Sequence, residues 1–529
     1  MRAPSNPSMT PLHRVCRPWL LLLLVTAAAA AQNPALYDEP YRPQTTFSPQ
    51  RNWTNDPNGL VYFKGEYHLF FQYNPFGNQW GHMSWGHAVS PDLLHWKELP
   101  VAIPEAGGEM IFTGSVVIDE KNSSGLCRGR EPCLVAVYTG HRGQGGTQRQ
   151  VQDIAVSVDR GRTWQAYSGN PVLDLHMSDF RDPNVTWNEE SRSWLMAVAL
   201  PNEHKIAFYT SPDLKQWTRQ STFGPAAATG GQWECPDLLR IPVGNGGRDV
   251  WALKVGLNPG SLQGGSGEQY FLGTFNRGQF TPSDAPGAHG WTDYGKDSYC
   301  AISYNHLPPG EKPTLLGWMN NWQYAGKLPT APWRGQMTLA RRMTVIQDGD
   351  GLALSQEPVI APLRLLPRES IHTSLPPSQE NAELITTESP AEFRLTFQPA
   401  DAEVLGLRIY SDAAHWTEIV YERSRQRFYV DRTHSGLEIA PEFPARTEAP
   451  LAEGRPWDLV LIVDRSSISA FAQNGTIAMT NLIFPRTPQA RVVLLRRGGS
   501  QKVTATGFAW KLHSIWSDAE RKSSLRSLR

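Results

Sequence analysis

A short turn motif that recurs in the N-terminal half of the chain constrains its fold more than any other feature. Each of three copies reads Ser-x-Asp and reaches a Trp four or five residues later, and a strand-like run precedes each copy. The three tryptophans, Trp96, Trp164 and Trp217, are 68 and 53 residues apart. Repeats of roughly 40 to 50 residues with several short strands and tight turns are typical of propeller blades, which insertions can lengthen. The sequence therefore predicts a β-propeller.

The composition agrees with many short strands joined by tight turns. Gly and Pro together number 87 of 529 residues, about 16% against roughly 12% on average, and charged residues make up 19% against about 25%. Within the repeated motif, we expect the Asp to accept hydrogen bonds from turn N–H groups and the Trp to pack beneath the turn. A chain of 529 residues has room for two to four domains, which excludes a single small fold.

The C-terminal third has a different strand pattern and predicts a separate domain. A proline-rich stretch at 355–380 is the expected linker, so the propeller is expected to cover 32–354. Beyond the linker, alternating apolar and polar residues indicate a β-sandwich over 381–517, followed by a polar tail at 518–529. The expected strands of the sandwich are 393–397, 405–410, 417–421, 428–431, 458–464, 467–472, 492–495 and 508–512.

Residues 1–31 are typical of a secretion signal. Basic residues precede an apolar run from Pro18 to Ala31, which is shorter than a typical ~20-residue membrane span and ends in small residues suited to cleavage. We therefore expect a secreted protein, periplasmic or at the cell surface in a bacterium, with no membrane contact after cleavage. Of the four cysteines outside this segment, Cys127 and Cys133 lie six residues apart in a polar loop and are candidates for a local disulfide.

The charge balance argues against two classes of partner. Lys plus Arg and Asp plus Glu each number 50, so the formal net charge is zero. Nucleic acids and anionic membranes attract strongly basic surfaces, which this composition does not provide. The sequence leaves the oligomeric state open.

No pattern in the sequence indicates a metal or a cofactor. The chain contains no CxxC and no HExxH motif, and Cys235 and Cys300 lack metal-type spacing. The histidines between His68 and His95 alternate with strand aromatics, so we expect them to pack or to add polarity to a subsite. Gly264–Gly267 is not followed by the Lys of a phosphate-binding loop, which favours a flexible loop. We therefore expect chemistry that uses no metal and no cofactor.

Three acids stand out because each is followed at once, or after one residue, by proline at the start of a strand-like run. Asp56, Asp182 and Glu234 are 126 and 52 residues apart, comparable to whole numbers of blades. Because the innermost strand of every blade starts near the propeller axis, these positions are expected to converge on one pocket. Two carboxylates about 5 to 5.5 Å apart perform retaining glycoside hydrolysis. The alternative for any one of the three motifs is an ordinary turn.

The segments around these acids resemble the signature blocks of glycoside hydrolase family 32, which comprises β-fructofuranosidases such as invertases, exo-inulinases and levanases. The similarity is strong over 41–342 and weaker in the sandwich. It implies an all-β protein with a five-bladed β-propeller, a C-terminal β-sandwich and an active site in the propeller funnel. The similar segments are Asn55–Gly59, Gln72–Pro75, Trp80–His82, Phe112–Ser115, Arg181–Pro183, Glu234–Pro236, Asn258–Gly260, Gly317–Trp322 and Pro332–Arg334.

The resemblance assigns a role to each acid. Asp56 matches the nucleophile, Glu234 the general acid/base, and Asp182 the acid that bonds fructose hydroxyls and stabilises the transition state. Thr54 and Thr113 stand where many members carry Met and Ser, which puts the substrate preference in question. The positions that match the fructosyl subsite are Trp53, Asn55, Gln72, Trp80, Phe112, Thr113, Ser115, Arg181 and Trp322.

Each role requires a particular protonation state. A nucleophile must be ionised, and we expect donors such as Asn55 to hold the charge of Asp56. An acid must be protonated, which burial beside Trp233 and repulsion from the other two carboxylates favour for Glu234. Arg181 is expected to hold Asp182 ionised.

These observations predict a secreted retaining enzyme that releases terminal β-D-fructofuranosyl units from sucrose or from fructans such as inulin and levan. Its partner is therefore a small-molecule or polysaccharide fructoside. One alternative is a fructosyltransferase on the same scaffold, and the other is a non-catalytic fructan-binding protein. The presence of all three acids argues against the second alternative.

Overall fold

The computed structural model describes residues 36–516 except 129–130, 144, 245–247, 349, 389 and 453. The predicted signal segment at 1–31 and the predicted tail at 518–529 lie outside the described residues. Strands dominate, and the helices of the described part are four single 3-10 turns. These turns are η1 (Gly145–Thr147), η2 (Pro201–Glu203), η3 (Ala325–Lys327) and η4 (Ala361–Leu363).

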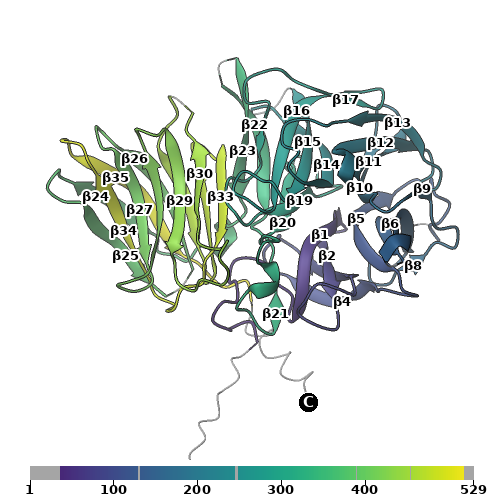
Figure 1. The fold of residues 1–529 in the computed structure, drawn as a ribbon, viewed down its shortest axis with the longest axis horizontal. Coiled ribbons are helices and arrows are strands. Elements are labelled where there is room, and N and C mark those ends of the chain that lie inside the picture. The colour runs from purple at the N-terminus through teal and green to yellow at the C-terminus, as the bar shows by residue number, and fades with distance from the viewer. Residues whose placement is uncertain are drawn as a thin grey trace, which may run out of the picture. The chain divides into compact units, whose positions relative to one another are not determined.

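Five sheets of mainly antiparallel strands form the N-terminal two thirds of the chain, and each is one propeller blade (Figure 1). Blade 1 contains β1 (Asn52–Phe63), β2 (Glu66–Asn74), β3 (Ser84–Ser90) and β4 (Lys97–Ile103), with β21 (Trp333–Arg334) parallel to β1. Blade 2 contains β5 (Met110–Asp119), β6 (Cys133–Arg142), β7 (Arg149–Ser157), β8 (Gln165–Ala166) and β9 (Leu173–Met177). Blade 3 contains β10 (Arg181–Asn188), β11 (Ser193–Leu200), β12 (Lys205–Ser211) and β13 (Thr218–Phe223).

The last two blades follow the same order. Blade 4 contains β14 (Gln232–Pro242), β15 (Asp249–Asn258), β16 (Gly267–Asn276), β17 (Gln279–Pro282) and β18 (His289–Trp291). Blade 5 contains β19 (Tyr299–Ser303), β20 (Thr314–Trp318), β22 (Arg341–Asp348) and β23 (Gly351–Pro358). The first strands contact one another in the order β1, β5, β10, β14, β19 and back to β1, which closes the ring. The predicted five-bladed propeller is confirmed.

The middle strands of the blades are buried on both faces because neighbouring blades pack against each other. In β11, seven of the eight residues are buried, from Trp194 to Leu200, and the run of Leu, Met, Ala and Val suits a strand with no solvent-facing side. Asn305 fastens the ring near its axis. Its side-chain amide donates to the carbonyls of Val116 and Val185, and its N–H donates to the carbonyl of Leu60.

Each first strand departs from regular pairing at an equivalent place. The register to the second strand shifts once near the beginning of β5, β10, β14 and β19, and the first of two shifts in β1 lies at the same level. Such β-bulges bend a strand and redirect its side chains, often beside active sites. The residues within these bulges are Asn55 and Asp56, Phe112 and Thr113, Asp182 and Pro183, Cys235 and Pro236, and Cys300 and Ala301.

The repeated Ser-x-Asp motif forms the turn between the third and fourth strands of blades 1, 2 and 3. In the first copy, the Asp92 carboxylate accepts hydrogen bonds from the backbone N–H groups of Leu94 and His95. Asp213 accepts the equivalent bonds in the third copy, and Asp159 accepts one from the Thr163 N–H in the second. The expectation that these acids serve the turn is confirmed.

Two six-stranded antiparallel sheets form the C-terminal sandwich. One sheet has the order β24 (Glu369–Leu375), β35 (Val503–Lys511), β26 (Ala391–Gln398), β31 (Asp458–Val463), β32 (Ser467–Ala472) and β33 (Ile477–Leu482). The other has the order β25 (Asn381–Thr387), β34 (Ala490–Arg497), β27 (Val404–Tyr410), β28 (Trp416–Glu422), β29 (Arg427–His434) and β30 (Arg446–Pro450). All eight predicted strands are present, and β24, β25, β30 and β33 are additional.

The segment between the two domains is shorter than the sequence predicts. The predicted linker of 355–380 contains the last residues of β23, which ends at Pro358 and completes blade 5. It also contains β24, which begins the sandwich at Glu369. The prolines misled this prediction. Pro358 ends an edge strand and Pro362 lies in the turn η4, and both places tolerate a residue without an N–H.

The two domains share buried contacts. Arg432 on β29 donates to the Asp297 carboxylate of the propeller, and Tyr324 also donates to that carboxylate. Asp293 of the propeller accepts from the N–H and the hydroxyl of Thr480 on β33. A hydrophobic cluster also spans both domains, with Leu69 and Leu316 on one side and Phe471 and Trp510 on the other. The sandwich therefore covers part of the propeller core.

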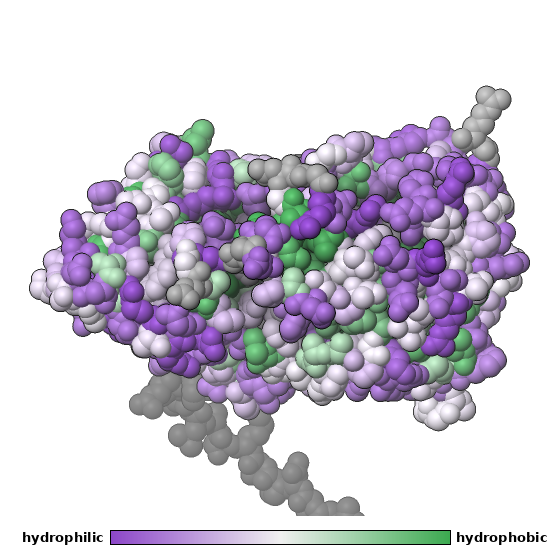
Figure 2. Space-filling view, turned by 90° about the horizontal axis from the view of Figure 1, so that it is seen from above, coloured by the Kyte–Doolittle hydropathy of each residue, from purple (hydrophilic) through white to green (hydrophobic). Residues whose placement is uncertain are grey.

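On the face shown in Figure 2, apolar residues lie in groups among hydrophilic ones. Across the described residues, no helix has the length and apolar character needed to cross a membrane.

Candidate active site

A cavity of about 370 Å³ opens where the bulges of the first strands meet, and this volume falls in the ~300–1,000 Å³ range of small-molecule sites. All three predicted acids line it, although they come from blades 1, 3 and 4. The lining residues are Asn55, Asp56, Gln72, Trp80, Phe112, Thr113, His141, Gln148, Gln150, Asp179, Arg181, Asp182, Glu234, Asn258 and Trp322.

Among the described residues, only one of the two carboxylate oxygens of Asp56 accepts a hydrogen bond. Its Oδ2 accepts from the Thr113 hydroxyl at 3.0 Å, and Cys235 Sγ lies 4.0 Å from the same oxygen. Its Oδ1 is buried and has no hydrogen-bond partner among the described residues. Buried polar atoms are nearly always paired, so this unpaired carboxylate oxygen marks Asp56 as a functional candidate.

Glu234 is held from two sides. Arg181 on β10 donates from Nε to Oε1 at 2.9 Å, and the Tyr299 hydroxyl on β19 donates to Oε2. Tyr299 is fully buried, whereas the Glu234 carboxylate is partly exposed to the cavity. The side chain of Glu234 is therefore oriented by residues from both neighbouring blades.

Asp182 is held through the backbone. Its Oδ2 accepts from the Cys235 N–H at 2.9 Å, and its own N–H donates to the Thr139 hydroxyl at 3.0 Å. The residue has a positive φ of 66°, a left-handed conformation that is uncommon outside glycine and for which Asp is one of the more tolerant residues. This conformation directs the carboxylate of β10 towards the residue that follows Glu234 on β14.

The three carboxylates raise the proton affinity of the site. Burial, followed by the charges of Asp182 and Glu234, raises the pKa of Asp56 to about 8, and the opposing effects of the Thr113 and Asn55 side chains are smaller. The expectation that donors such as Asn55 hold Asp56 ionised is therefore wrong near neutral pH. Burial also raises the pKa of Asp182 to about 7, with Arg181 opposing and Glu234 adding to the shift. The cluster therefore binds protons near neutral pH, because each proton relieves the repulsion between buried negative charges.

Arg181 was expected to hold Asp182 ionised, but the pKa of Asp182 is raised to about 7 despite the nearby guanidinium. The guanidinium makes its hydrogen bonds to Glu234, Asp179, Gln150 and Gln232. Through its charge alone, Arg181 still lowers the pKa of Asp182.

Seven of the nine predicted subsite residues line the cavity, and two do not. Trp53 is fully buried, lies against the ring of Trp322 at 5.9 Å and donates from Nε1 to Asn55 Oδ1. Ser115 lies one residue past the bulge of β5, and its hydroxyl joins blades 2 and 3 by donating to the Pro183 carbonyl and accepting from the Val185 N–H. Both residues support the wall from behind it.

Aromatic rings form part of the rim. Trp80 is 47% exposed and meets the edge of Phe112, which in turn stacks on His141 at 4.7 Å. Trp322 packs on Trp318 and Trp53. Flat apolar faces beside carboxylates and amides are suited to sugars, whose rings offer C–H faces and hydroxyl edges.

The prediction from sequence missed several residues of the site. Tyr299, His141, Gln148, Gln150 and Asp179 were not singled out, and Asn258 was noted only as part of a similar segment. Asp179 could have been found, because it lies two residues before Arg181. The signal for Tyr299 was weaker: it begins the first strand of blade 5, immediately before the bulge, at the position that Glu234 has in blade 4.

Two disulfides are present, Cys127–Cys133 and Cys235–Cys300. The first joins the pair that the sequence proposed, and the second joins two cysteines for which no partner was predicted. Two close groups of metal-ligand side chains occur in the described residues, and each consists of one Asp and one of these pairs. A disulfide sulfur is not the thiolate that binds metals, so neither group is a metal centre in this state.

The predicted histidine cluster has no place in the cavity. His68 and His87 form a buried pair, with Nδ1 and Nε2 3.1 Å apart, and the ring of Phe70 stacks on both. Burial lowers the pKa of His68 to about 4, so the pair is neutral at physiological pH. Packing is therefore its role, which was one of the two expected.

Comparison with known protein families identifies the family of the chain. Residues 46–358 match the glycosyl hydrolases family 32 N-terminal domain, and residues 363–511 match the family 32 C-terminal domain. The chain belongs to glycoside hydrolase family 32. This membership makes it a glycosidase of the β-fructofuranosidase class, and it confirms the resemblance seen in the sequence.

Among its family 32 relatives, the chain is 41% identical to the levanase of Bacillus subtilis (strain 168), over 91% of this chain and 72% of the levanase. It is 38% identical to the extracellular exo-inulinase of Aspergillus awamori, over 91% of this chain and 96% of the exo-inulinase. The crystal structure of the A. awamori exo-inulinase superposes with a TM-score of 0.84 at 37% identity, covering 91% of this chain and all of that one.

Proposed function

We propose that the protein is a retaining exo-β-fructosidase that removes terminal β-D-fructofuranosyl units from sucrose or from fructans. The observation that carries the proposal is the convergence of three carboxylates in one cavity, where Glu234 is oriented by Arg181 and Tyr299. Relatives named levanase, exo-inulinase and invertase support the choice of substrate.

In the first step, the Asp56 carboxylate attacks the anomeric carbon of the fructosyl unit while Glu234 gives its proton to the leaving oxygen. The bond to the leaving group breaks, and an ester between Asp56 and fructose forms. Asp182 accepts hydrogen bonds from fructose hydroxyls, and its charge stabilises the positive character of the transition state. The aromatic rim at Trp80 and Phe112 packs against the sugar.

In the second step, Glu234 accepts a proton from water, which attacks the same carbon and releases Asp56. Glu234 therefore alternates between carboxylic acid and carboxylate. The Tyr299 hydroxyl suits both states, because a hydroxyl can donate to the carboxylate and, after its proton rotates, accept from the acid. The cycle requires Asp56 to be ionised, and its raised pKa of about 8 limits the ionised fraction below that pH.

Water is the proposed acceptor, which makes the enzyme a hydrolase. A fructosyltransferase would use the same three carboxylates and differ only in what attacks the intermediate. The relatives named levanase, exo-inulinase and invertase favour hydrolysis. Because all three acids line one cavity, a purely sugar-binding role has no support.

We also propose that the protein is secreted. Two disulfides favour an oxidising compartment, and the relative from A. awamori is named extracellular. The apolar leader in the sequence supports the same location. A direct check is the presence of the protein in culture medium and its loss when residues 1–31 are deleted.

The roles of Asp56 and Glu234 can be separated with leaving groups of different acidity. In Glu234→Ala, sucrose hydrolysis is expected to fall by several orders of magnitude, because a sugar alkoxide leaves poorly without a proton. An aryl β-fructofuranoside with an acidic phenol needs no such help, so its first step is expected to be largely preserved. Azide, which attacks without losing a proton, is expected to restore turnover and give the β-fructosyl azide.

Asp56→Ala provides the matched comparison. Without the nucleophile, both substrates lose turnover, and any azide product would have the inverted configuration. Equal losses on both substrates in Glu234→Ala with no response to azide, or near-normal sucrose hydrolysis in Asp56→Ala, would contradict the proposed roles.

A further inference from the structure

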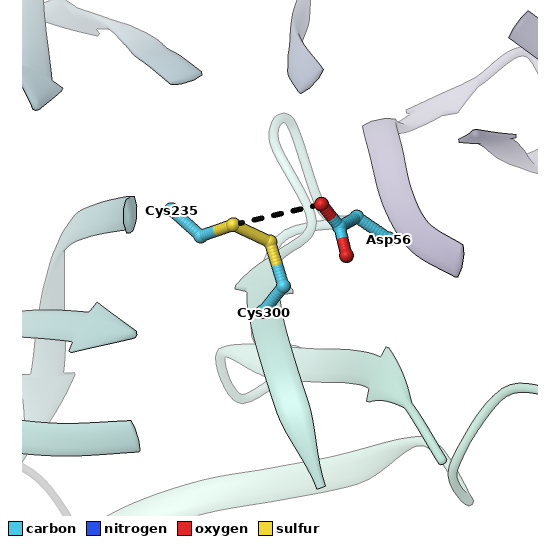
Figure 3. Close-up of side chains that lie close together, drawn as sticks. All are labelled: Asp56, Cys235 and Cys300. Carbon is cyan, nitrogen blue, oxygen red and sulfur yellow. Dashed lines mark hydrogen bonds between the residues drawn. A yellow bond between two sulfur atoms is a disulfide. The ribbon is translucent and has the colours of Figure 1, made fainter. Parts of the chain in front are cut away.

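The Cys235–Cys300 disulfide joins β14 and β19 behind the residues that line the site. Its two α-carbons are 5.3 Å apart, and the bond joins the bulges of blades 4 and 5. Figure 3 shows the bond beside the Asp56 carboxylate, with Cys235 Sγ 4.0 Å from Oδ2. Both cysteines are almost completely buried. No role in the proposed mechanism has yet been given to this bond.

Each cysteine directly follows one of the two residues joined by the Tyr299–Glu234 hydrogen bond. Cys235 follows Glu234 and Cys300 follows Tyr299, and the Tyr299 hydroxyl donates to Glu234. In addition, the Cys235 N–H donates to the Asp182 carboxylate at 2.9 Å. The disulfide therefore joins the backbones that carry the acid/base and its hydroxyl partner, at the residue that also holds the third carboxylate.

The backbone at both cysteines is in an unfavourable conformation. Cys235 has φ of 46° and Cys300 has φ of 50°, values that residues with a side chain rarely adopt. Such conformations persist only where the surroundings impose them, and they cluster at functional sites. A covalent bond between the two bulges is a direct means of imposing them.

We propose that the Cys235–Cys300 disulfide is a positioning element of the active site, which keeps Glu234 and Tyr299 in register with Asp56 and Asp182 and makes activity depend on the oxidised state of the pair. The inference rests on the proposed function. The bond touches no reacting atom. It acts through the residues beside it.

Loss of the bond has two expected consequences. The bulges can relax towards ordinary strand conformations, which moves Glu234 away from the leaving oxygen. A thiol also replaces a neutral sulfur bridge beside Asp56, which adds a titratable group to a crowded cluster. A misplacement of about 1 Å can cost about 10²-fold in rate.

The other disulfide is a matched control. Cys127–Cys133 follows the far end of β5, whereas the cavity residues Phe112 and Thr113 lie near its beginning. Its loss is expected to leave the reaction unchanged. Cys127→Ser/Cys133→Ser therefore serves as the background in which Cys235–Cys300 is the only disulfide among the described residues.

The main test compares Cys300→Ala and Cys235→Ala/Cys300→Ala in this background, each assayed below its thermal midpoint. For Cys300→Ala, kcat on sucrose is expected to fall about 10- to 100-fold, while KM changes by less than about threefold because the sugar contacts remain. The aryl β-fructofuranoside is expected to lose far less, because it needs no proton from Glu234. The pH profile of the single variant is expected to change, and that of the double variant to change less because it contains no thiol beside Asp56.

A second measurement avoids any problem with folding of the variants. The background protein is treated with dithiothreitol, which is oxidised to its cyclic disulfide while Cys235 and Cys300 each gain one electron and one proton. Alkylation and mass spectrometry give the fraction reduced. Sucrose turnover is expected to fall in proportion to that fraction and to recover when the pair is reoxidised.

Two outcomes would overturn the inference. One is a folded Cys300→Ala enzyme with the parent ratio of sucrose to aryl fructoside turnover and an unchanged pH profile. The other is full sucrose turnover in protein shown to be reduced. Failure of the proposed function looks different, because then the parent enzyme itself would not hydrolyse either fructoside, or Asp56→Ala would remain active.

Discussion

Two buried carboxylates, Asp56 in the propeller and Asp464 in the sandwich, show how differently the two domains use charge. Asp464 accepts four donors: the N–H groups of Gln44, Thr45 and Arg465 and the Thr45 hydroxyl. Asp56 accepts from the Thr113 hydroxyl and keeps Oδ1 without a partner among the described residues. A fully bonded buried carboxylate fastens a structure, whereas a partly bonded one is available to a ligand.

The difference extends to the surroundings of each residue. Through its hydrogen bonds to Gln44 and Thr45, Asp464 joins the segment that leads into the propeller to the end of β31. Its hydrogen-bond partners among the described residues are N–H and O–H groups. Asp56 shares its cavity with Asp182 and Glu234, whose charges raise its pKa to about 8. Burial also raises the pKa of Asp464, but at Asp56 the repulsion from two neighbouring carboxylates adds to the effect of burial, which is typical of sites that perform acid–base chemistry.

The largest expected effect comes from Asp56→Asn. Sucrose turnover is expected to fall by about 10⁴-fold or more, because an amide cannot form the ester intermediate. The thermal midpoint at pH 7 is expected to rise. The pKa of Asp56 is higher in the folded state than in the unfolded chain, so the free energy of unfolding falls as the pH rises from the unfolded pKa to about 8. Asn does not titrate, so the substitution removes this loss of stability. A lower midpoint with activity retained would abolish the contrast with Asp464.

Asp464→Ala is expected to have the opposite pattern. The change leaves the buried N–H groups of Gln44 and Thr45 without an acceptor, which is expected to cost about 3 kcal/mol or more of unfolding free energy. Turnover per folded molecule is expected to stay at the parent value. Urea unfolding and kcat measured on the same preparations check both statements, and a large loss of kcat without loss of stability would count against them.

A smaller effect is expected from Cys127→Ser/Cys133→Ser. A disulfide that closes so short a loop stabilises a fold by roughly 2 kcal/mol on chain-entropy grounds. Because the loop is remote from the cavity, kcat and KM on sucrose are expected to remain those of the parent. Unfolding curves with and without the substitutions measure the first value. A change in the pH profile would show that the two disulfides are not functionally distinct.

The smallest effect concerns acidic pH. Asp56 must be ionised to attack, and its pKa is about 8, so kcat/KM on sucrose is expected to fall about tenfold per pH unit below that value. In Asp182→Asn, one negative charge is gone and the remaining carboxyl groups release protons more easily. The acidic limb of the residual activity is therefore expected to move to lower pH, and a shift to higher pH would contradict this electrostatic account.

Much of the architecture could be predicted from the sequence because it rests on local signals. The Ser-x-Asp turn recurs as a local hydrogen-bonded unit, and alternating residues predicted eight of the twelve sandwich strands. The proline-rich stretch misled the boundary, because proline is also tolerated at edge strands and in a 3-10 turn. Trp53 and Ser115 were expected to line the site, but their positions depend on the packing between blades.

The sequence by itself determined that three Pro-flanked acids start strands one or more blades apart, and with them the chemistry that the site can perform. Only the tertiary structure decided what surrounds those acids. Tyr299 reaches Glu234, Arg181 turns to Glu234 instead of Asp182, and Cys235 pairs with Cys300 because bulges from different blades meet near the axis. Side-chain direction at a bulge depends on pairing with strands far away in the chain, so no local pattern contains it.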